Sequence, residues 1–190
     1  MSWSAESSDE ELMLLYRDGD AAAFDALYAR HKGGLYRYLL RQCRDAASAE
    51  ELFQDVWTNL IRARAGYTVQ AKFTTYLYRL AHNRLIDHYR KHSHAAMVSF
   101  ESEEGEAIAE LPDTRERPAD DALDARRQAG RLLELIAELP EAQREAFLLQ
   151  QEGGMSVEEI ARATGVTRET AKSRLRYAIN RLRQGMREWR

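Results

Sequence analysis

The sequence is poor in cysteine and in long apolar runs. Its single cysteine, Cys43, excludes an internal disulfide and is typical of a protein that works in a reducing compartment. The longest apolar run near the N-terminus, Leu12 to Tyr16, is far too short for a signal peptide or a membrane-spanning helix. We therefore expect a cytoplasmic protein with no membrane insertion.

Signatures of catalysis and of cofactor binding are also missing. The sequence has no glycine-rich phosphate loop and no familiar motif that pairs a nucleophile with a base. His88, His92 and His94 raise the alternative of a metal site, but they lie among basic residues at a predicted helix end. We expect no catalytic residue, no cofactor and no metal, so the protein is not predicted to be an enzyme.

Charge is distributed unevenly along the 190 residues, although the net charge is only -3. Residues 62–94 carry 7 basic and 1 acidic side chains, and residues 162–190 carry 9 and 2, whereas residues 101–124 carry 2 and 10. Each basic block can follow the phosphates of a nucleic acid locally. The alternative is that both blocks are only solvated surface.

Helix signals follow one another along the chain, without a convincing strand pattern. Ser8 and Ser48 are each followed by glutamate three residues later, so each is predicted to open a helix with a capping box. Asp20 is predicted to cap the helix between them, and a long helix is predicted from about Phe73 to Lys91. These helices form a predicted first domain over residues 1–92.

The composition changes after this domain. Residues 93–122 are acidic, contain two of the three prolines and have few apolar side chains, which predicts a flexible linker. Helical periodicity returns in residues 123–190, where Pro140 is predicted to begin a helix. The predicted architecture is all-α: two small helical domains joined by an acidic flexible linker, the C-terminal one containing a helix-turn-helix.

Residues 155–184 have the pattern of that helix-turn-helix. Ser156 with Glu159 is a predicted capping box, Gly165 permits a left-handed turn residue, and Thr167 can cap the next helix. The second helix has one apolar stripe, and its other side is polar and basic, which suits base edges and phosphates; an ordinary solvated helix face is the alternative. The predicted DNA-contacting residues are Arg168, Glu169, Lys172, Ser173, Arg174 and Arg176.

A second candidate surface lies on the predicted helix 73–91. Aromatic, amide and guanidinium groups project from one narrow arc of this helix, and these groups suit unstacked bases and a phosphate backbone. The alternative for the tyrosine in this arc is ordinary half-buried packing. The candidate residues are Lys72, Tyr76, Arg79, Asn83 and Arg90.

Three segments together resemble the extracytoplasmic-function sigma factors of bacteria. They are AEELFQDVWTNL (49–60), FTTYLYRLAHNRLIDHYRK (73–91) and SVEEIARATGVTRETAKSRL (156–175), in the order and spacing of that family. The resemblance covers nearly the whole chain. It implies that the first domain binds core RNA polymerase and the minus-ten promoter element, and that the second binds the minus-thirty-five element. It also implies an anti-sigma factor as regulator.

The resemblance further implies where the partners bind. The 49–60 helix would dock on the clamp helices of the largest polymerase subunit, and the second domain on the flap of the second-largest. The loop 66–72 and Asn83 match the family's pocket for a base flipped from the non-template strand, so the first domain would help to melt DNA. Trp57 suits either a polymerase contact or the core. The outward residues implied for polymerase binding are Glu51, Gln54, Asp55 and Thr58.

Some positions depart from the family pattern. Tyr76 stands where tryptophan is frequent, and Tyr177 and Ile179 stand where arginine is frequent, which implies a weaker hold on upstream phosphates. The acidic linker either follows the RNA exit path of the polymerase or is only a soluble tether. A different class of function also accounts for the second domain: a conventional helix-turn-helix regulator that binds duplex operators without being a polymerase subunit.

Overall fold

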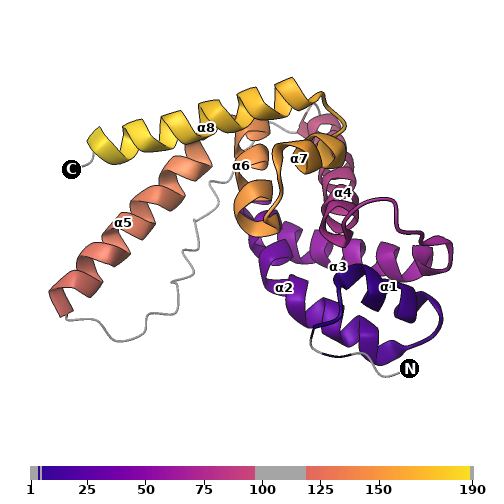
Figure 1. Ribbon diagram of the computed structural model, residues 1–190. Helices are drawn as coiled ribbons and strands as arrows, with labels where there is room; N and C mark the ends of the chain where they lie inside the picture. The colour runs from indigo at the N-terminus through magenta and orange to yellow at the C-terminus, as the bar shows by residue number, and fades with distance from the viewer. Residues whose placement is uncertain (1–3, 5, 97–118, 189–190) are drawn as a thin grey trace.

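The computed structural model describes residues 4, 6–96 and 119–188, and within these ranges it is all-α, as predicted (Figure 1). A single 3-10 turn, η1, follows the third α-helix, and no strand occurs in the described ranges. The helices are α1 (Asp9–Arg17), α2 (Ala21–Cys43), α3 (Ala46–Ala63), η1 (Arg64–Gly66), α4 (Phe73–Ala96), α5 (Ala119–Glu138), α6 (Glu141–Gly153), α7 (Val157–Thr164) and α8 (Arg168–Glu188).

The first domain is built from α1 to α4. The predicted capping box of Ser8 with Glu11 opens α1, and the Asp20 carboxylate accepts from two backbone N–H groups at the start of α2. Leu12 and Leu27 are fully buried between these helices and the two that follow. The apolar faces of all four helices therefore share one core.

The third helix begins three residues earlier than the sequence pattern predicts. Asp45 is the capping residue, since its Oδ2 accepts from the Ser48 N–H at 2.8 Å. Ser48 consequently lies inside the first turn of α3 and does not cap it, so the predicted capping box of Ser48 with Glu51 is wrong. In the predicted capping box the Glu51 carboxylate would accept from the Ser48 N–H. Asp45 accepts from this N–H group instead.

The region between the domains is more helical at its ends than predicted. The long helix was expected to end at about Lys91 but continues to Ala96, and α5 begins at Ala119. Most of the predicted linker, residues 97–118, lies outside the described residues. No helix in the described part of the chain is long and apolar enough to cross a membrane.

The second domain consists of α5 to α8. Pro140 precedes α6 as expected, and Gly154 ends that helix in a left-handed conformation with φ of +60°. Leu135 and Ile136 of α5 and Leu148 and Leu149 of α6 are buried against the last two helices. Helices α7 and α8 pack on α6 and on each other, so these three helices form one unit.

The two domains lie against each other. Helix α6 packs on α2, and α7 packs on α4, so that α6 and α7 stand between α8 and the first domain (Figure 1). The sequence patterns predict two domains on a tether and carry no prediction of a contact between them. The contact fixes the positions of both candidate surfaces.

Candidate nucleic-acid interface

The helix-turn-helix has the local geometry that its sequence predicts. The Ser156 hydroxyl accepts from the Glu159 N–H at 3.3 Å, and the Glu159 carboxylate accepts from the Ser156 N–H at 2.8 Å, which completes the capping box. Gly165 ends α7 with φ of +68°, a conformation that strains other residues. Thr167 Oγ1 accepts from the Thr170 N–H at 3.2 Å at the start of α8. Both ends of the turn are therefore fixed.

Helix α8 separates an inward apolar stripe from an outward polar face. Glu169, Lys172 and Arg176 are exposed, and Ser173 and Arg174 are half-buried. This arrangement places short polar groups and long cations where a major groove would approach them. All four residues of the predicted inward stripe are buried: Ala171, Leu175, Ala178 and Leu182.

Arg168 differs from the other predicted DNA contacts because its guanidinium is already engaged. It hydrogen-bonds to the Glu158 carboxylate of α7 and lies 3.2 Å from the Glu169 carboxylate. These bonds, that to Glu158 first, raise the pKa of Arg168 above its usual value. A DNA phosphate must therefore displace a carboxylate to reach this cation. The ion pair also ties the two helices of the motif together.

The two unusual positions of the last helix have different environments. Tyr177 is 51% exposed, and the Arg176 guanidinium lies 5.1 Å from the centre of its ring, a cation–π contact on the outward side. Ile179 is half-buried against the core and points away from this face. Ile179 therefore packs toward the core, whereas Tyr177 lies on the exposed side of α8.

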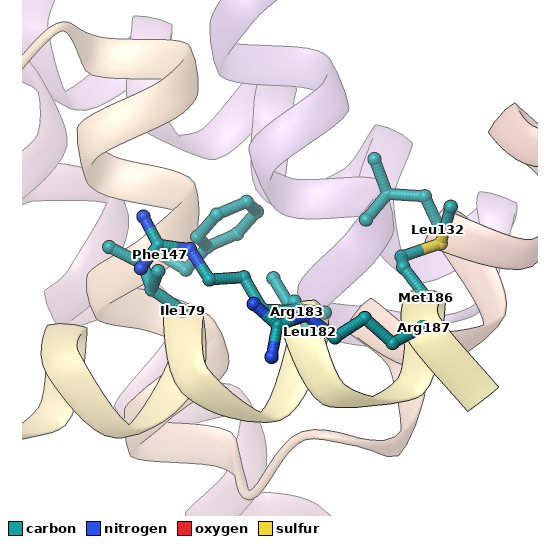
Figure 2. A pocket seen from close by; sticks show the side chains of 7 residues that line it. All are labelled: Leu132, Phe147, Ile179, Leu182, Arg183, Met186 and Arg187. Carbon is teal, nitrogen blue, oxygen red and sulfur yellow. The ribbon is translucent and has the colours of Figure 1, made fainter.

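An apolar groove of about 330 Å³ lies where α8 crosses α5 and α6 (Figure 2). Apolar side chains from the three helices form its floor, and two arginines of α8 lie along it, as Figure 2 shows. The groove follows the C-terminal half of α8, so a partner can occupy it while residues 168–176 remain uncovered. Its lining is Leu132, Phe147, Ile179, Leu182, Arg183, Met186 and Arg187.

The stripe on α4 is exposed except for its aromatic member. Arg79, Asn83 and Arg90 are exposed, as is Lys72 just before the helix. Tyr76 is half-buried, and burial raises the pKa of its hydroxyl. Its ring lies 5.2 Å from the Tyr67 ring, centre to centre. Tyr76 therefore packs on one side and presents the remainder of its ring beside the polar stripe.

The loop between η1 and α4 is attached to α1 at both ends. Arg17 Nη1 donates to the Tyr67 carbonyl oxygen at 3.3 Å, and Glu10 Oε1 accepts from the Phe73 N–H at 2.6 Å. Between these points residues 68–70 are exposed. Lys72 reaches the other domain, with its Nζ 2.9 Å from the Glu159 carboxylate. No local sequence signal indicates these contacts, which join residues 50 or more positions apart.

The outward face of α3 is as predicted from the helical period. Trp57 is only 5% exposed, and its ring packs against the Phe24 and Tyr28 rings, which assigns it to the core. The polar side therefore remains open to a partner over much of α3. Its exposed residues are Glu51, Gln54, Asp55 and Thr58.

A buried carboxylate joins the two domains. Glu145 of α6 is 8% exposed, and its Oε1 accepts from the Tyr38 hydroxyl at 2.8 Å. The same oxygen lies 2.7 Å from His82 Nδ1 of α4. Burial, followed by the charge of Glu145, raises the pKa of Tyr38 well above its usual value, so the hydroxyl remains a donor. One side chain of the second domain thus binds two helices of the first.

Further polar contacts flank this carboxylate. Glu152 pairs with Arg37 at 2.9 Å and also with Arg41, both on α2. Arg144 is 5% exposed and donates from Nε to Gln42 Oε1 at 2.9 Å. A sequence signal for these contacts exists: Arg144, Glu145 and Glu152 fall on the same arc of α6 as buried leucines. Charged residues at that spacing indicate a covered polar face.

The histidines and the cysteine form no metal cluster among the residues that the structure describes. His88 contacts the Tyr89 ring, while the side chains of His92 and His94 lie outside the described residues. Cys43 is half-buried, and burial raises the pKa of its thiol to about 12. The thiol is therefore protonated near neutral pH.

Comparison with known proteins relates both candidate surfaces to one family. Residues 27–95 match the family described as Sigma-70 region 2, and residues 129–182 match Sigma-70, region 4. The chain is 33% identical to the ECF RNA polymerase sigma factor RpoE of Cereibacter sphaeroides, over 92% of this chain and 93% of the relative. It is 30% identical to the RNA polymerase sigma factor CarQ of Myxococcus xanthus, over 89% of this chain and 92% of the relative.

Solved structures share the fold. The sigma factor RpoE in complex with the anti-sigma factor NepR from Bartonella quintana has a TM-score of 0.71 and 21% identity, covering 86% of this chain and 96% of that one. CnrH in complex with the cytosolic domain of CnrY has a TM-score of 0.66 and 21% identity, covering 94% and 96%. Together with the sequence matches, this shows that the chain belongs to the extracytoplasmic-function (ECF) RNA polymerase sigma factors.

Proposed function

We propose that the protein is a promoter-specificity subunit of RNA polymerase, which binds the core enzyme, directs it to promoters and helps to melt the minus-ten DNA. The observation that carries this proposal is the pair of exposed polar faces, one on α4 and one on α8, in domains that match sigma regions 2 and 4. Sigma factors are in general not enzymes. The protein acts by binding, in the cytoplasm, without a catalytic residue or cofactor of its own.

The domains divide this work. Residues 1–92 bind the core enzyme and the minus-ten element, residues 93–122 link the domains, and residues 123–190 bind the minus-thirty-five element. The exposed residues of α8 read duplex DNA, with Arg176 and Lys172 nearest to base edges and phosphates. Helix α4 has the task of holding a strand that has left the duplex.

Melting follows from preferential binding of the open strand. Exposed Asn83 and Arg79 on α4, with the exposed loop 68–70, offer hydrogen bonds and positive charge to an unpaired strand. Unstacking a base costs a few kcal/mol, and stacking and hydrogen bonding on the protein offset this cost. Paired DNA gains none of these contacts, so binding energy drives the opening.

The polymerase contacts are assigned to two surfaces. The exposed polar side of α3 suits the clamp helices, and the apolar groove beside α8 suits an apolar segment of the flap. Because Ile179 lines the groove and lies off the recognition face, Ile179→Glu should weaken binding to core polymerase and leave duplex binding unchanged. Equal loss of both would contradict the assignment.

Regulation by an anti-sigma factor is part of the proposal. Two proteins of similar fold, RpoE and CnrH, have been solved with partners, namely the anti-sigma factor NepR and the cytosolic domain of CnrY. We extend such a partnership to this chain, which a partner would hold inactive until a signal releases it. The partner would cover the surfaces that core polymerase needs.

Run-off transcription from a promoter library, with core polymerase in the presence and absence of the protein, tests the proposal. Start sites should depend on the protein. A conventional duplex-binding regulator would instead bind operators tightly alone and leave the start sites of the core enzyme unchanged, and that result would overturn the sigma function.

Two variants separate the roles of the domains. Asn83→Ala should slow strand opening more than it weakens recruitment of polymerase to the promoter. Arg176→Ala should weaken or relax recognition of the upstream element, seen as a changed footprint there. Equal loss of opening and recruitment in the first variant, or an unchanged footprint in the second, would remove that residue from its role.

A further inference from the structure

Helix α1 is attached to both ends of the loop that precedes α4. Glu10 accepts from the Phe73 N–H at 2.6 Å, at the point where α4 begins, and Arg17 donates to the Tyr67 carbonyl at 3.3 Å. The Arg64 guanidinium lies 5.1 Å from the Tyr16 ring centre, so η1 is held by the same helix. These contacts leave the middle of the loop exposed while its ends cannot drift.

We propose that Glu10 and Arg17 are positioning residues for capture of the flipped base, an inference that rests on the proposed function. They touch no DNA themselves. Glu10 also supplies a carboxylate to the orphan N–H group at the N-terminus of α4, which fixes where the helix that carries Asn83 starts. Base capture requires such fixed geometry, because a small displacement of a reading group is costly in rate.

Glu10→Ala and Glu10→Gln test this role, since glutamine retains an oxygen acceptor for the Phe73 N–H. Glu11→Ala is the matched control: Glu11 accepts from the Ser8 N–H at 2.9 Å and supports α1 without touching the loop. Strand opening is followed by 2-aminopurine fluorescence with core polymerase. Two promoters are compared, one intact and one with an abasic site at the flipped position.

Glu10→Ala should slow opening about tenfold on the intact promoter and leave it unchanged on the abasic one. Glu10→Gln should restore most of the rate, and Glu11→Ala should match the unsubstituted protein on both promoters. Equal slowing on the two promoters, or equal effects of the two alanine variants, would overturn the positioning role. If the unsubstituted protein ignored the abasic site, the flipped-base function itself would fail.

A separate observation concerns the contact between the domains, which depends on a glycine. A Cβ added at Gly34 of α2 would lie 3.0 Å from the Glu152 carbonyl oxygen and 3.1 Å from the Tyr78 hydroxyl. Gly34 therefore lets the backbone of α6 approach α2 closely. Ala29 of the same helix is exposed and offers a position for a substitution away from this contact.

In this closed arrangement the candidate DNA-binding surfaces of the two domains are brought close together. Lys72 pairs with Glu159 of α7, and the neighbouring Glu158 pairs with Arg168 of α8. Two ion pairs and one peptide unit thus connect Lys72, a candidate contact for the downstream element, with Arg168, a candidate contact for the upstream element. Promoter elements named for positions ten and thirty-five lie about 25 base pairs, or roughly 85 Å, apart. The closed arrangement cannot span that distance.

We propose that the closed arrangement is an autoinhibitory contact of the chain with itself, which must open before both promoter elements are bound. The pair between Lys72 and Glu159 is one of the contacts that are lost when the domains part. The 23 residue steps between Ala96 and Ala119 reach at most about 80 Å, and the domains on either side supply the small remainder of the roughly 85 Å between the elements. The faces of α8 that read duplex DNA are exposed in the closed form, so upstream binding alone needs no opening.

Gly34→Leu places a wedge against the Glu152 backbone, and Ala29→Leu is the control on the exposed side of the same helix. Glu152→Gln is a second route to opening, because it weakens the pairs with Arg37 and Arg41 without adding bulk. Small-angle scattering of the free protein reports the separation of the domains. A titration with core polymerase and promoter DNA reports the concentration needed for half-maximal transcript.

Gly34→Leu and Glu152→Gln should enlarge the free protein and lower the half-maximal concentration by about threefold or more, since the closed form reduces the binding-competent fraction. Ala29→Leu should match the unsubstituted protein in both assays, and all four proteins should bind an isolated upstream duplex equally. Unchanged scattering would overturn the closed contact. Enlarged proteins with an unchanged half-maximal concentration would overturn autoinhibition. Absence of any promoter-dependent transcript would instead count against the sigma function, and scattering would still test the contact.

Discussion

Replacement of Arg144 by methionine tests how strongly the domains stabilise each other. The guanidinium is buried and donates to Gln42 Oε1 at 2.9 Å and to the carbonyl oxygens of Ala137 and Leu139 at 3.2 Å each. Methionine retains much of the stem and removes all three hydrogen bonds. Because the Ala137 oxygen also accepts from Arg44, two acceptors lose a donor without an evident substitute.

The expected loss is about 2 kcal/mol of unfolding free energy. Each buried acceptor left without a partner costs roughly 1–3 kcal/mol. Removal of the charge offsets part of this loss of unfolding free energy, because burial lowers the pKa of Arg144 and thus penalises its charged form. For a chain of this size a loss of about 2 kcal/mol lowers Tm by roughly 4–8 °C.

Thermal and urea unfolding, followed by far-ultraviolet circular dichroism, measure the change. Arg126→Met on the exposed side of α5 is the control and should stay within about 0.5 kcal/mol. In a double-mutant cycle with Gln42→Ala, the double variant should lose about 1 kcal/mol less unfolding free energy than the sum of the losses of the two single variants. Strict additivity would show that Arg144 and Gln42 do not meet in solution and would refute the described domain contact.

Three other predictions concern single side chains. Ser156→Ala should destabilise the protein by about 1 kcal/mol and weaken duplex binding, because the eight-residue α7 loses its capping box. Thermal unfolding and a duplex titration measure the two effects, and Ser156→Thr is the control. At Asp9, burial raises the pKa, but hydrogen bonds from His31 and Arg30 outweigh it, so the folded pKa lies below the usual 3.8. The unsubstituted protein should therefore be more stable than Asp9→Asn above pH 3.8, and this difference in unfolding free energy should disappear as the pH falls through the lower folded pKa. A difference that persists at the lowest pH would contradict this. Tyr177→Arg should strengthen duplex binding and steepen its salt dependence by about one unit of slope, and an unchanged slope would remove this position from the phosphate-facing side.

Local patterns predicted much of the fold. The capping boxes at Ser8 and Ser156 and the left-handed Gly165 each depend on residues within four positions of one another, so sequence spacing alone determines them. The helical period likewise identified the buried stripe of α8 and the exposed side of α3. At Ser48 the same reasoning failed because Asp45 competes for the same N–H group.

Contacts between distant residues could not be predicted in this way. Glu145 bonds to groups 63 and 107 positions away, and a glutamate in a helix shows no preference for one distant partner over another. The sequence around Gly34 does not indicate that the backbone of α6 approaches this glycine closely, because that approach arises only in the tertiary structure. Most candidate DNA-binding residues lie on exposed faces of regular helices, which the helical period predicts, whereas their supports on α1 come from the tertiary fold.

The polar character of the domain contact has a consequence for solubility. Glu145, Glu152 and Lys72 meet hydroxyl, imidazole, guanidinium and carboxylate groups across it, all of which water can solvate when the domains part. Apolar side chains lie beside these polar groups: Met155 and Tyr78 are buried and meet near Gly153, and the buried side chains of both domains form one cluster. An opened protein therefore also uncovers apolar surface, and we expect it to stay in solution best when a partner covers that surface.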